Sequence, residues 1–184
     1  FLKENFQGDK LNVIYSGNLG LTHNSDIILN GAKTLEKISE ISLTVIGGGS
    51  SKELIKRSSK EIKNLFYLPF QPENVLPFSL VCADIAIVIL GEGTEGISMP
   101  SKLYYSMASG SAILSISNGE NDLKYIVEKT GCGINVANND LKGFTKAIIK
   151  FNNDKEFLDN CKKNSRDAAV KFFSSEEILP QYIN

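Results

Sequence analysis

The chain has 184 residues, of which 42% are hydrophobic and 22% charged, and its formal net charge is -1. This length supports one sizeable core, and the near-neutral charge gives no reason to expect nucleic acid as a partner. The three cysteines (Cys82, Cys132 and Cys161) are far apart and form no disulfide framework or metal-ligand motif, and no apolar run is long enough to span a membrane.

Six short runs rich in valine, isoleucine and leucine recur along the chain, each bounded by Gly, Pro, Asn or Ser. They predict strands at Leu11–Ser16, Ile41–Ile46, Leu65–Leu68, Ile85–Leu90, Ala112–Ile116 and Gly133–Val136. Their apolar character is continuous rather than alternating, which is typical of strands buried on both faces of a parallel sheet.

Helical patterns separate these runs. They predict helices at Asp26–Ile38, Ser51–Lys63, Glu73–Val81, Pro100–Ser109, Asp122–Lys129, Asp140–Asn152, about Asp154–Phe172, and Ser175–Gln181. Pro77 lies inside the third of these, so we expect that helix to be short, kinked or late to start. The alternation predicts an α/β fold: a single Rossmann-like, doubly wound parallel sheet of about six strands with helices on both faces.

Ligands of such sheets bind outside the carboxyl ends of the strands. The loops expected there begin with Ser16–Asn24 (SGNLGLTHN) and Gly47–Gly49, where glycines permit a close approach of the backbone to a ligand. Neither loop has the GxGxxG or GxxxxGK[ST] pattern, which argues against a dinucleotide cofactor and a Walker-type ATPase. A tight turn without a ligand remains the alternative for each loop.

The segment Glu95–Gly110 (EGISMPSKLYYSMASG) is the most informative part of the chain. A glycine-punctuated loop opens a helix that we expect to begin at Pro100, with Ser101 and Lys102 in its first turn. Backbone N–H groups of Gly96–Met99 and Ser101, together with the Lys102 charge, suit a phosphate or diphosphate. The alternative is a solvated loop before an ordinary helix. No His–carboxylate pair or Ser-His-Asp arrangement favours a hydrolase.

Six pieces of the sequence, in this order, resemble the C-terminal, donor-binding half of retaining glycosyltransferases of the GT-B fold, in the large family four group. These pieces are YSGNLG (Tyr15–Gly20), TVIGGG (Thr44–Gly49), LPFQPENVLP (Leu68–Pro77), ADIAIVIL (Ala83–Leu90), MPSKLYYSMASG (Met99–Gly110) and TGCGINV (Thr130–Val136). The PSKLY…MASG piece is similar to the branch of bacterial enzymes that assemble O-antigen or capsule repeat units on a polyprenyl diphosphate lipid.

The resemblance implies a set of site residues and also several departures from the family. The family's Arg and Lys that hold the diphosphate fall on Asn18 and His23, so Lys102 is expected to compensate for the lost charge. The family's two glutamates fall on Ile97 and Tyr105, which leaves Glu95 as the candidate catalytic carboxylate. The expected donor-binding residues are Gly17, Asn18, His23, Phe70, Gln71, Gly96, Ile97, Ser98, Met99, Ser101, Lys102, Leu103 and Tyr105. Phe70 and Gln71 are expected to contact the base of the nucleotide.

The family's reaction transfers a sugar from a nucleotide diphosphate donor with retention and needs no metal or other cofactor. By resemblance we expect a UDP-linked donor, transfer of a hexose or N-acetylhexosamine, and a glycan or polyprenyl-diphosphate-linked acceptor in lipopolysaccharide or other surface polysaccharide synthesis. The expected location is the cytoplasm, with peripheral placement at the inner face of the cytoplasmic membrane.

Residues 1–174 are expected to form the donor-binding domain, and residues 175–184 to cross back to an acceptor-binding N-terminal half, which we expect to be missing because the chain begins with Phe1. Such a fragment is expected to bind donor weakly and to transfer nothing alone. Two alternatives stay open: a sugar-nucleotide epimerase of the same two-domain architecture, and a non-catalytic nucleotide-sugar-binding module.

Overall fold

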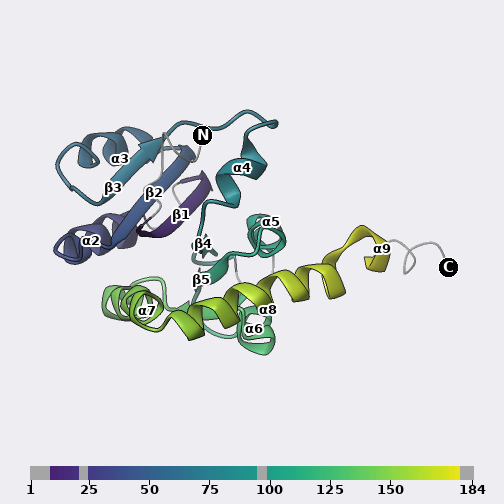
Figure 1. Cartoon of the computed structure of the whole chain (residues 1–184). Helices are drawn as coiled ribbons and strands as arrows, with labels where there is room; N and C mark the ends of the chain where they lie inside the picture. Colours follow the sequence, from purple (N-terminus) through teal and green to yellow (C-terminus); the bar gives the residue numbers. More distant parts are fainter. Residues whose placement is uncertain (1–8, 21–24, 95–98, 179–184) are drawn as a thin grey trace.

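The computed structural model describes residues 9–20, 25–94 and 99–178, which form a six-stranded parallel sheet with helices on both sides (Figure 1). The strands are β1 (Leu11–Asn18), β2 (Ile41–Gly48), β3 (Leu65–Leu68), β4 (Ile85–Ile89), β5 (Ala112–Ile116) and β6 (Gly133–Val136). Their order in the sheet is β3-β2-β1-β4-β5-β6. The predicted doubly wound sheet is confirmed, and the chain reverses its direction of winding between β1 and β4, where such folds bind ligands.

The described helices follow the predicted alternation. They are α2 (Ser25–Leu35), α3 (Lys52–Ser58), α4 (Leu76–Leu80), α5 (Lys102–Ala108), α6 (Asp122–Thr130), α7 (Leu141–Asn153), α8 (Lys155–Phe173) and α9 (Ser175–Ile178). As expected from Pro77, α4 starts late. Helix α5 begins at Lys102 rather than at the predicted Pro100, and Ser101 precedes it without a side-chain capping bond. Helix α3 ends at Ser58, five residues before the predicted Lys63. After it, the Lys56 carbonyl accepts from the Ser59 hydroxyl, and the N–H of Lys60 bonds the Arg57 carbonyl instead of continuing the α-helical pattern.

Strands β1 and β2 each continue two residues beyond their predicted ends. Gly17 pairs with Gly47 and Asn18 with Gly48, so the ladder runs through the glycines that the sequence pattern treats as strand boundaries. A Cβ on Gly47 would lie 2.0 Å from the backbone oxygen of Gly17, so only glycine allows the two strand ends to lie this close. At Gly17 and Gly47 the ends of β1 and β2 therefore carry no side chain.

The two faces of the sheet have separate cores. Helices α2, α3 and α7 pack on one face around side chains such as Tyr15 and Phe144. On the other face, α5 and α6 pack around Val88 and Met107, while Ile14 and Ile46 belong to a third, smaller cluster that also contains Cys82 and Ala83, beside α4. The face that carries α4 and α5 thus has a divided core.

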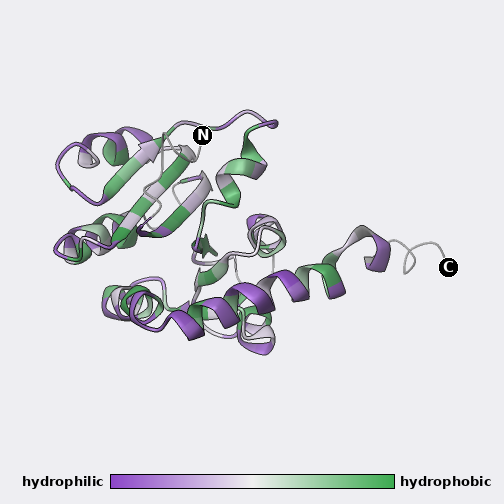
Figure 2. Cartoon of the chain, viewed as in Figure 1, coloured by the Kyte–Doolittle hydropathy of each residue, from purple (hydrophilic) through white to green (hydrophobic). Residues whose placement is uncertain are grey.

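Helix α8 connects the two sides of the molecule. Its first half contributes Leu158 and Cys161 to the first core, and its second half contributes Ala168 and Ala169 to the core of α5 and α6. Figure 2 shows the strands as largely hydrophobic and much of the visible surface of α8 as hydrophilic. Within the described residues, no helix is both long enough and apolar enough to cross a membrane.

Candidate functional site

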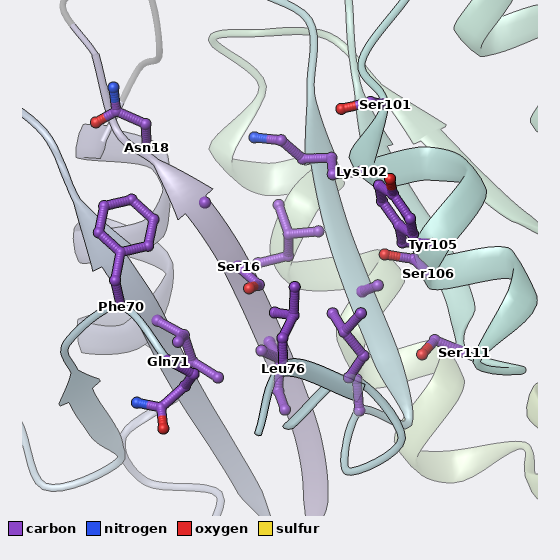
Figure 3. Close-up of a pocket in the computed structure, with 17 residues that line it drawn as sticks. Ser16, Asn18, Phe70, Gln71, Leu76, Ser101, Lys102, Tyr105, Ser106 and Ser111 are labelled. Carbon is purple, nitrogen blue, oxygen red and sulfur yellow. The ribbon is translucent and has the colours of Figure 1, made fainter. Parts of the chain in front are cut away.

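A pocket of about 320 Å³ opens at the carboxyl end of β1, on the face with the divided core (Figure 3). It lies between the two clusters of that face, because α4 has only five residues and leaves the sheet uncovered beside α5. Its lining residues are Ile14, Ser16, Gly17, Asn18, Ile46, Phe70, Gln71, Leu76, Leu80, Ala83, Ala86, Ile87, Ser101, Lys102, Tyr105, Ser106 and Ser111. The mouth of the pocket is polar and its floor is mainly aliphatic.

Lys102 supplies the positive charge of this pocket. Its Nζ donates a hydrogen bond to Oη of Tyr15 at 2.8 Å and lies 4.3 Å from the centroid of the Tyr15 ring. The Tyr15 hydroxyl in turn donates to the backbone oxygen of Asn18 at 3.0 Å. Side chains from α5 and β1, which are far apart in the sequence, thus meet at the end of the sheet.

The Lys102 ammonium is half-buried and lacks an acidic partner among the described residues, where the ion pairs are Lys124–Glu120 and Lys162–Asp84. Burial lowers the pKa of Lys102 from 10.5 to about 8, because a low-dielectric environment disfavours the charged form. Burial also raises the pKa of the Tyr15 hydroxyl, which is therefore neutral at physiological pH. The pocket holds a positive charge that an anion would stabilise.

Phe70 and Asn18 lie on the opposite side of the pocket mouth from Lys102, as Figure 3 shows. The Phe70 ring is 61% exposed. One edge of it lies over Gly48, where an added Cβ would approach the ring to 2.9 Å. An exposed aromatic face at a ligand pocket offers a surface against which a planar base can stack. The Gln71 amide nitrogen donates one hydrogen to the Pro69 carbonyl within its own turn, which leaves its oxygen and its second N–H for a ligand.

The structure brings seven of the predicted donor-binding residues to one pocket: Gly17, Asn18, Phe70, Gln71, Ser101, Lys102 and Tyr105. Two others do not line it. Leu103 is fully buried in the core of α5 and α6, and its N–H group bonds the Pro100 carbonyl; Met99 packs against the same core. Glu95, Gly96, Ile97, Ser98 and His23 lie outside the described residues.

Sequence reasoning missed the polar residues that support the pocket from within. Tyr15 contacts Lys102, and Ser16, Ser106 and Ser111 place hydroxyl-bearing side chains along the wall. A tyrosine directly before the Ser16–Gly17 pair, at the end of the apolar run of β1, is the local signal that points to such a role.

A second cluster of polar residues lies at the carboxyl ends of β4, β5 and β6. Glu92 accepts hydrogen bonds from the amide nitrogens of Asn118 at 3.4 Å and Asn139 at 3.3 Å. The backbone N–H of Asn138 donates to the side-chain oxygen of Asn118 at 3.0 Å. These hydrogen bonds connect the loops that follow β4, β5 and β6. Among the described residues, no set of three or more His, Cys, Asp or Glu side chains is arranged to hold a metal.

Comparison with known proteins gives the same family over most of the chain. Residues 1–168 match the family model described as "Glycosyl transferases group 1". The chain is 30% identical over 139 residues to WbjE of Pseudomonas aeruginosa, named as a glycosyltransferase, and 23% identical over 177 residues to WcaI of Escherichia coli K12, named as a colanic acid biosynthesis glycosyl transferase. These alignments cover 73% and 94% of this chain but only 34% and 42% of the relatives.

Solved structures share the fold at low sequence identity. The sucrose-phosphate synthase of Thermosynechococcus elongatus superposes with a TM-score of 0.79 at 18% identity, over 98% of this chain and 45% of that one. HepE of Anabaena, solved in complex with UDP-glucose, superposes with a TM-score of 0.76 at 13% identity, over 95% of this chain and 48% of that one. The described fold thus corresponds to one half of a GT-B architecture.

Proposed function

The chain belongs to the glycosyl transferases group 1 family, and we propose that it is the part of a retaining glycosyltransferase that binds the nucleotide diphosphate sugar. The observation that carries this proposal is the Lys102 ammonium, which lies in a pocket at the switch point of the sheet without a carboxylate partner among the described residues. A diphosphate supplies the negative charge that this site lacks.

The proposed roles follow the layout of the pocket. Lys102 contacts the diphosphate, and Phe70 stacks on the base from the opposite side of the mouth. Catalysis by such a site consists of orienting the donor and stabilising the diphosphate as it leaves. Glu95 is the proposed carboxylate beside the transferred sugar. Tyr105 is 62% exposed at the rim of the pocket, where it contacts the nucleotide.

A uridine donor and a surface-polysaccharide acceptor are the proposed substrates. HepE is solved with UDP-glucose, and WcaI is named for colanic acid biosynthesis, which supports both choices. The transferred group is then a hexose or N-acetylhexosamine, and the reaction needs no metal. Because the alignments span less than half of the curated relatives, we assign acceptor binding to a second domain at the cytoplasmic face of the membrane. The segment 175–184 is proposed to lead toward that domain, and its last six residues, 179–184, lie outside the described residues.

Calorimetric titration of the 184-residue chain tests the donor assignment. UDP-glucose and UDP-N-acetylglucosamine are expected to bind weakly, and GDP-mannose more weakly still. Phe70→Ala is expected to reduce the affinity about tenfold, the scale of an aromatic–base stack. Phe78→Ala is the matched control, because Phe78 is 59% exposed and lies outside the pocket. Absence of binding by every nucleotide sugar contradicts the proposal.

A transfer assay tests the assignment of the acceptor site to a second domain. The purified chain, given UDP-sugar and a polyprenyl diphosphate or glycan acceptor, is expected to show no sugar transfer. Transfer by this chain alone contradicts the assignment, while leaving donor binding intact.

A further inference from the structure

The contact between Lys102 and Tyr15 joins the two sides of the sheet. Tyr15 belongs to the core beneath α2 and α7, whereas Lys102 comes from α5 on the other face. The Lys102 stem therefore has to pass over the end of β1 to reach the Tyr15 hydroxyl, 2.8 Å from its Nζ. A lysine bound only to solvent has no reason to adopt this path.

Gly17 makes the path possible. A Cβ at Gly17 would lie 3.3 Å from Nζ and 3.5 Å from Cε of Lys102, and 3.9 Å from the Tyr15 hydroxyl. Its φ of +143° also suits glycine better than any other residue. The bare backbone at this position leaves space for the ammonium directly above the strand end.

The hydroxyl of Tyr15 is oriented to accept. Its single proton is donated to the backbone oxygen of Asn18 at 3.0 Å, which leaves the lone pairs of Oη for the Lys102 ammonium. Tyr15 is fully buried, so its ring cannot move to follow the lysine. The ring also lies 4.3 Å from Nζ and attracts the cation.

We propose that Tyr15 is a positioning residue for donor binding: its hydroxyl holds the Lys102 ammonium over the end of β1, where the diphosphate binds. This inference rests on the proposed function, because it takes the donor's diphosphate as the anion. Tyr15 itself contacts no substrate. It acts by accepting a hydrogen bond from the ammonium, which keeps Lys102 charged at the strand end before the donor arrives and so keeps it ready to form the charge-assisted bond.

The titratable groups that line the pocket are Lys102 and Tyr105, with Tyr15 beneath them. Elements β1, β2 and α4 add no other charged side chain to the lining, within the described part of the chain. His23 and Glu95 lie outside the described residues. The comparison of wild type with Tyr15→Phe is therefore repeated in the His23→Gln and Glu95→Gln backgrounds, where the same pH-dependent difference is expected if Lys102 is its source.

Loss of the Tyr15 hydroxyl should make the charged form of Lys102 harder to maintain, because that hydrogen bond favours the ammonium. Tyr15→Phe is therefore expected to shift the pH profile of UDP-glucose affinity to lower pH. The esterified diphosphate of this donor keeps a constant charge over the range tested. At about pH 6 the variant should bind within about twofold of wild type, and at about pH 8 it should bind about five- to tenfold more weakly.

Three comparisons isolate the effect. In a Lys102→Met background, Tyr15→Phe is expected to cost nothing further, since its effect passes through the ammonium. Tyr125→Phe is the matched control, because Lys129 donates to the Tyr125 hydroxyl at 2.6 Å in an equivalent but exposed pair on α6. The pKa of Lys102, followed by NMR of its ammonium in the chain without donor, should be lower in Tyr15→Phe.

The outcomes separate this inference from the proposed function. Equal losses of affinity at every pH, or the same loss in the Lys102→Met background, overturn the positioning role and show a packing role instead. An unchanged Lys102 pKa also overturns it. If wild type binds no nucleotide sugar, the proposed function fails and the donor role of Tyr15 fails with it, whereas binding by wild type with an unaltered Tyr15→Phe profile contradicts the inference alone.

Discussion

The carboxyl ends of the strands form one edge of the sheet, and its two halves, at β1 and at β4–β6, use polar side chains in opposite ways. At the end of β1, the Lys102 ammonium meets only neutral partners among the described residues, the closest being the Tyr15 hydroxyl. At the ends of β4 to β6, the polar groups bind one another: Glu92 accepts from Asn118 and Asn139. The charge of the first half is partly buried, whereas the Glu92 charge of the second half is exposed to solvent and already accepts two hydrogen bonds.

Beneath the second half lies another internally bonded layer. The Asn135 side-chain oxygen accepts from the hydroxyls of Ser115 at 2.7 Å and Ser117 at 2.8 Å, and both serines are buried. A ligand gains little by replacing hydrogen bonds that are already made, whereas it gains much by pairing with an unpaired buried charge. From this comparison we propose that the β1 half binds ligand and that the β5–β6 half holds loops in place.

Removal of the Lys102 charge should have the largest effect on donor binding of any single change described here. Lys102→Met keeps most of the stem and removes the ammonium, so the affinity for UDP-glucose is expected to fall about 30- to 100-fold, the scale of a charge-assisted hydrogen bond. Lys129→Met is the control, since this lysine also contacts a tyrosine but lies on the surface of α6. A loss below about threefold, measured by calorimetry, would remove Lys102 from the site.

Asn135→Ala should have a comparable effect on stability and none on binding. The substitution leaves the Ser115 and Ser117 hydroxyls without their shared acceptor, at a cost of about 2 kcal/mol in the free energy of unfolding. Urea denaturation measures that cost, and Asn160→Ala on the exposed surface of α8 is the control. Donor affinity should stay within about twofold of wild type. A tenfold loss of affinity without a loss of stability contradicts the division between the two halves.

Much of this fold could be predicted from sequence because its strands are continuous apolar runs, and buried parallel strands need that composition. Three strands, including Leu65–Leu68, have the predicted bounds. The predicted ends of β1 and β2 were wrong because glycine usually ends a strand, whereas here the glycines continue the ladder by close backbone approach. A glycine after an apolar run can end a strand or extend its ladder by close backbone approach, and the local sequence does not distinguish the two.

The candidate site could be predicted only in part. Seven of its residues lie at or just after a strand end, or at the start of α5 and within it, and local pattern with family resemblance was sufficient to propose them. The Lys102–Tyr15 contact joins residues 87 positions apart, so no local pattern indicates it. Leu103 belongs to the predicted set and adjoins Lys102, but in a helix the neighbouring side chain points about 100° away, here into the core.

The stability of the fold should change in the opposite direction from donor affinity when Lys102 is replaced. Burial lowers the pKa of Lys102 from 10.5 in the unfolded chain to about 8 in the folded one. Between these values the unfolded state binds more protons, so stability rises with pH there, and below about pH 8 the folded state carries the full cost of burying the charge. Lys102→Met is therefore expected to raise the free energy of unfolding at neutral pH.

The expected gain is about 1 kcal/mol, reduced from the full shift because the ammonium reaches solvent at the pocket mouth. Thermal unfolding at about pH 7 and at about pH 10 measures it, and the advantage of the variant should shrink at the higher pH. Destabilisation by Lys102→Met at neutral pH would indicate that its contact with Tyr15 stabilises the fold more than its burial costs.

Glu92→Gln should have the smallest effect, and it is the most direct check on the second half of the edge. Glu92 is exposed and accepts from two asparagine amides through Oε1 at 3.3–3.4 Å, and glutamine keeps an oxygen that accepts the same bonds. The free energy of unfolding is expected to change by less than about 0.5 kcal/mol, since exposed charges contribute little. Donor affinity is expected to stay within about twofold of wild type, because the carboxylate already has partners and does not line the pocket.

Glu92→Ala removes the acceptor as well and should loosen the loops of Asn118 and Asn139, seen as faster amide hydrogen exchange there. If Glu92→Gln instead lowers UDP-glucose affinity about tenfold with unchanged stability, the carboxylate holds the donor's sugar, and the binding site extends across both halves of the edge.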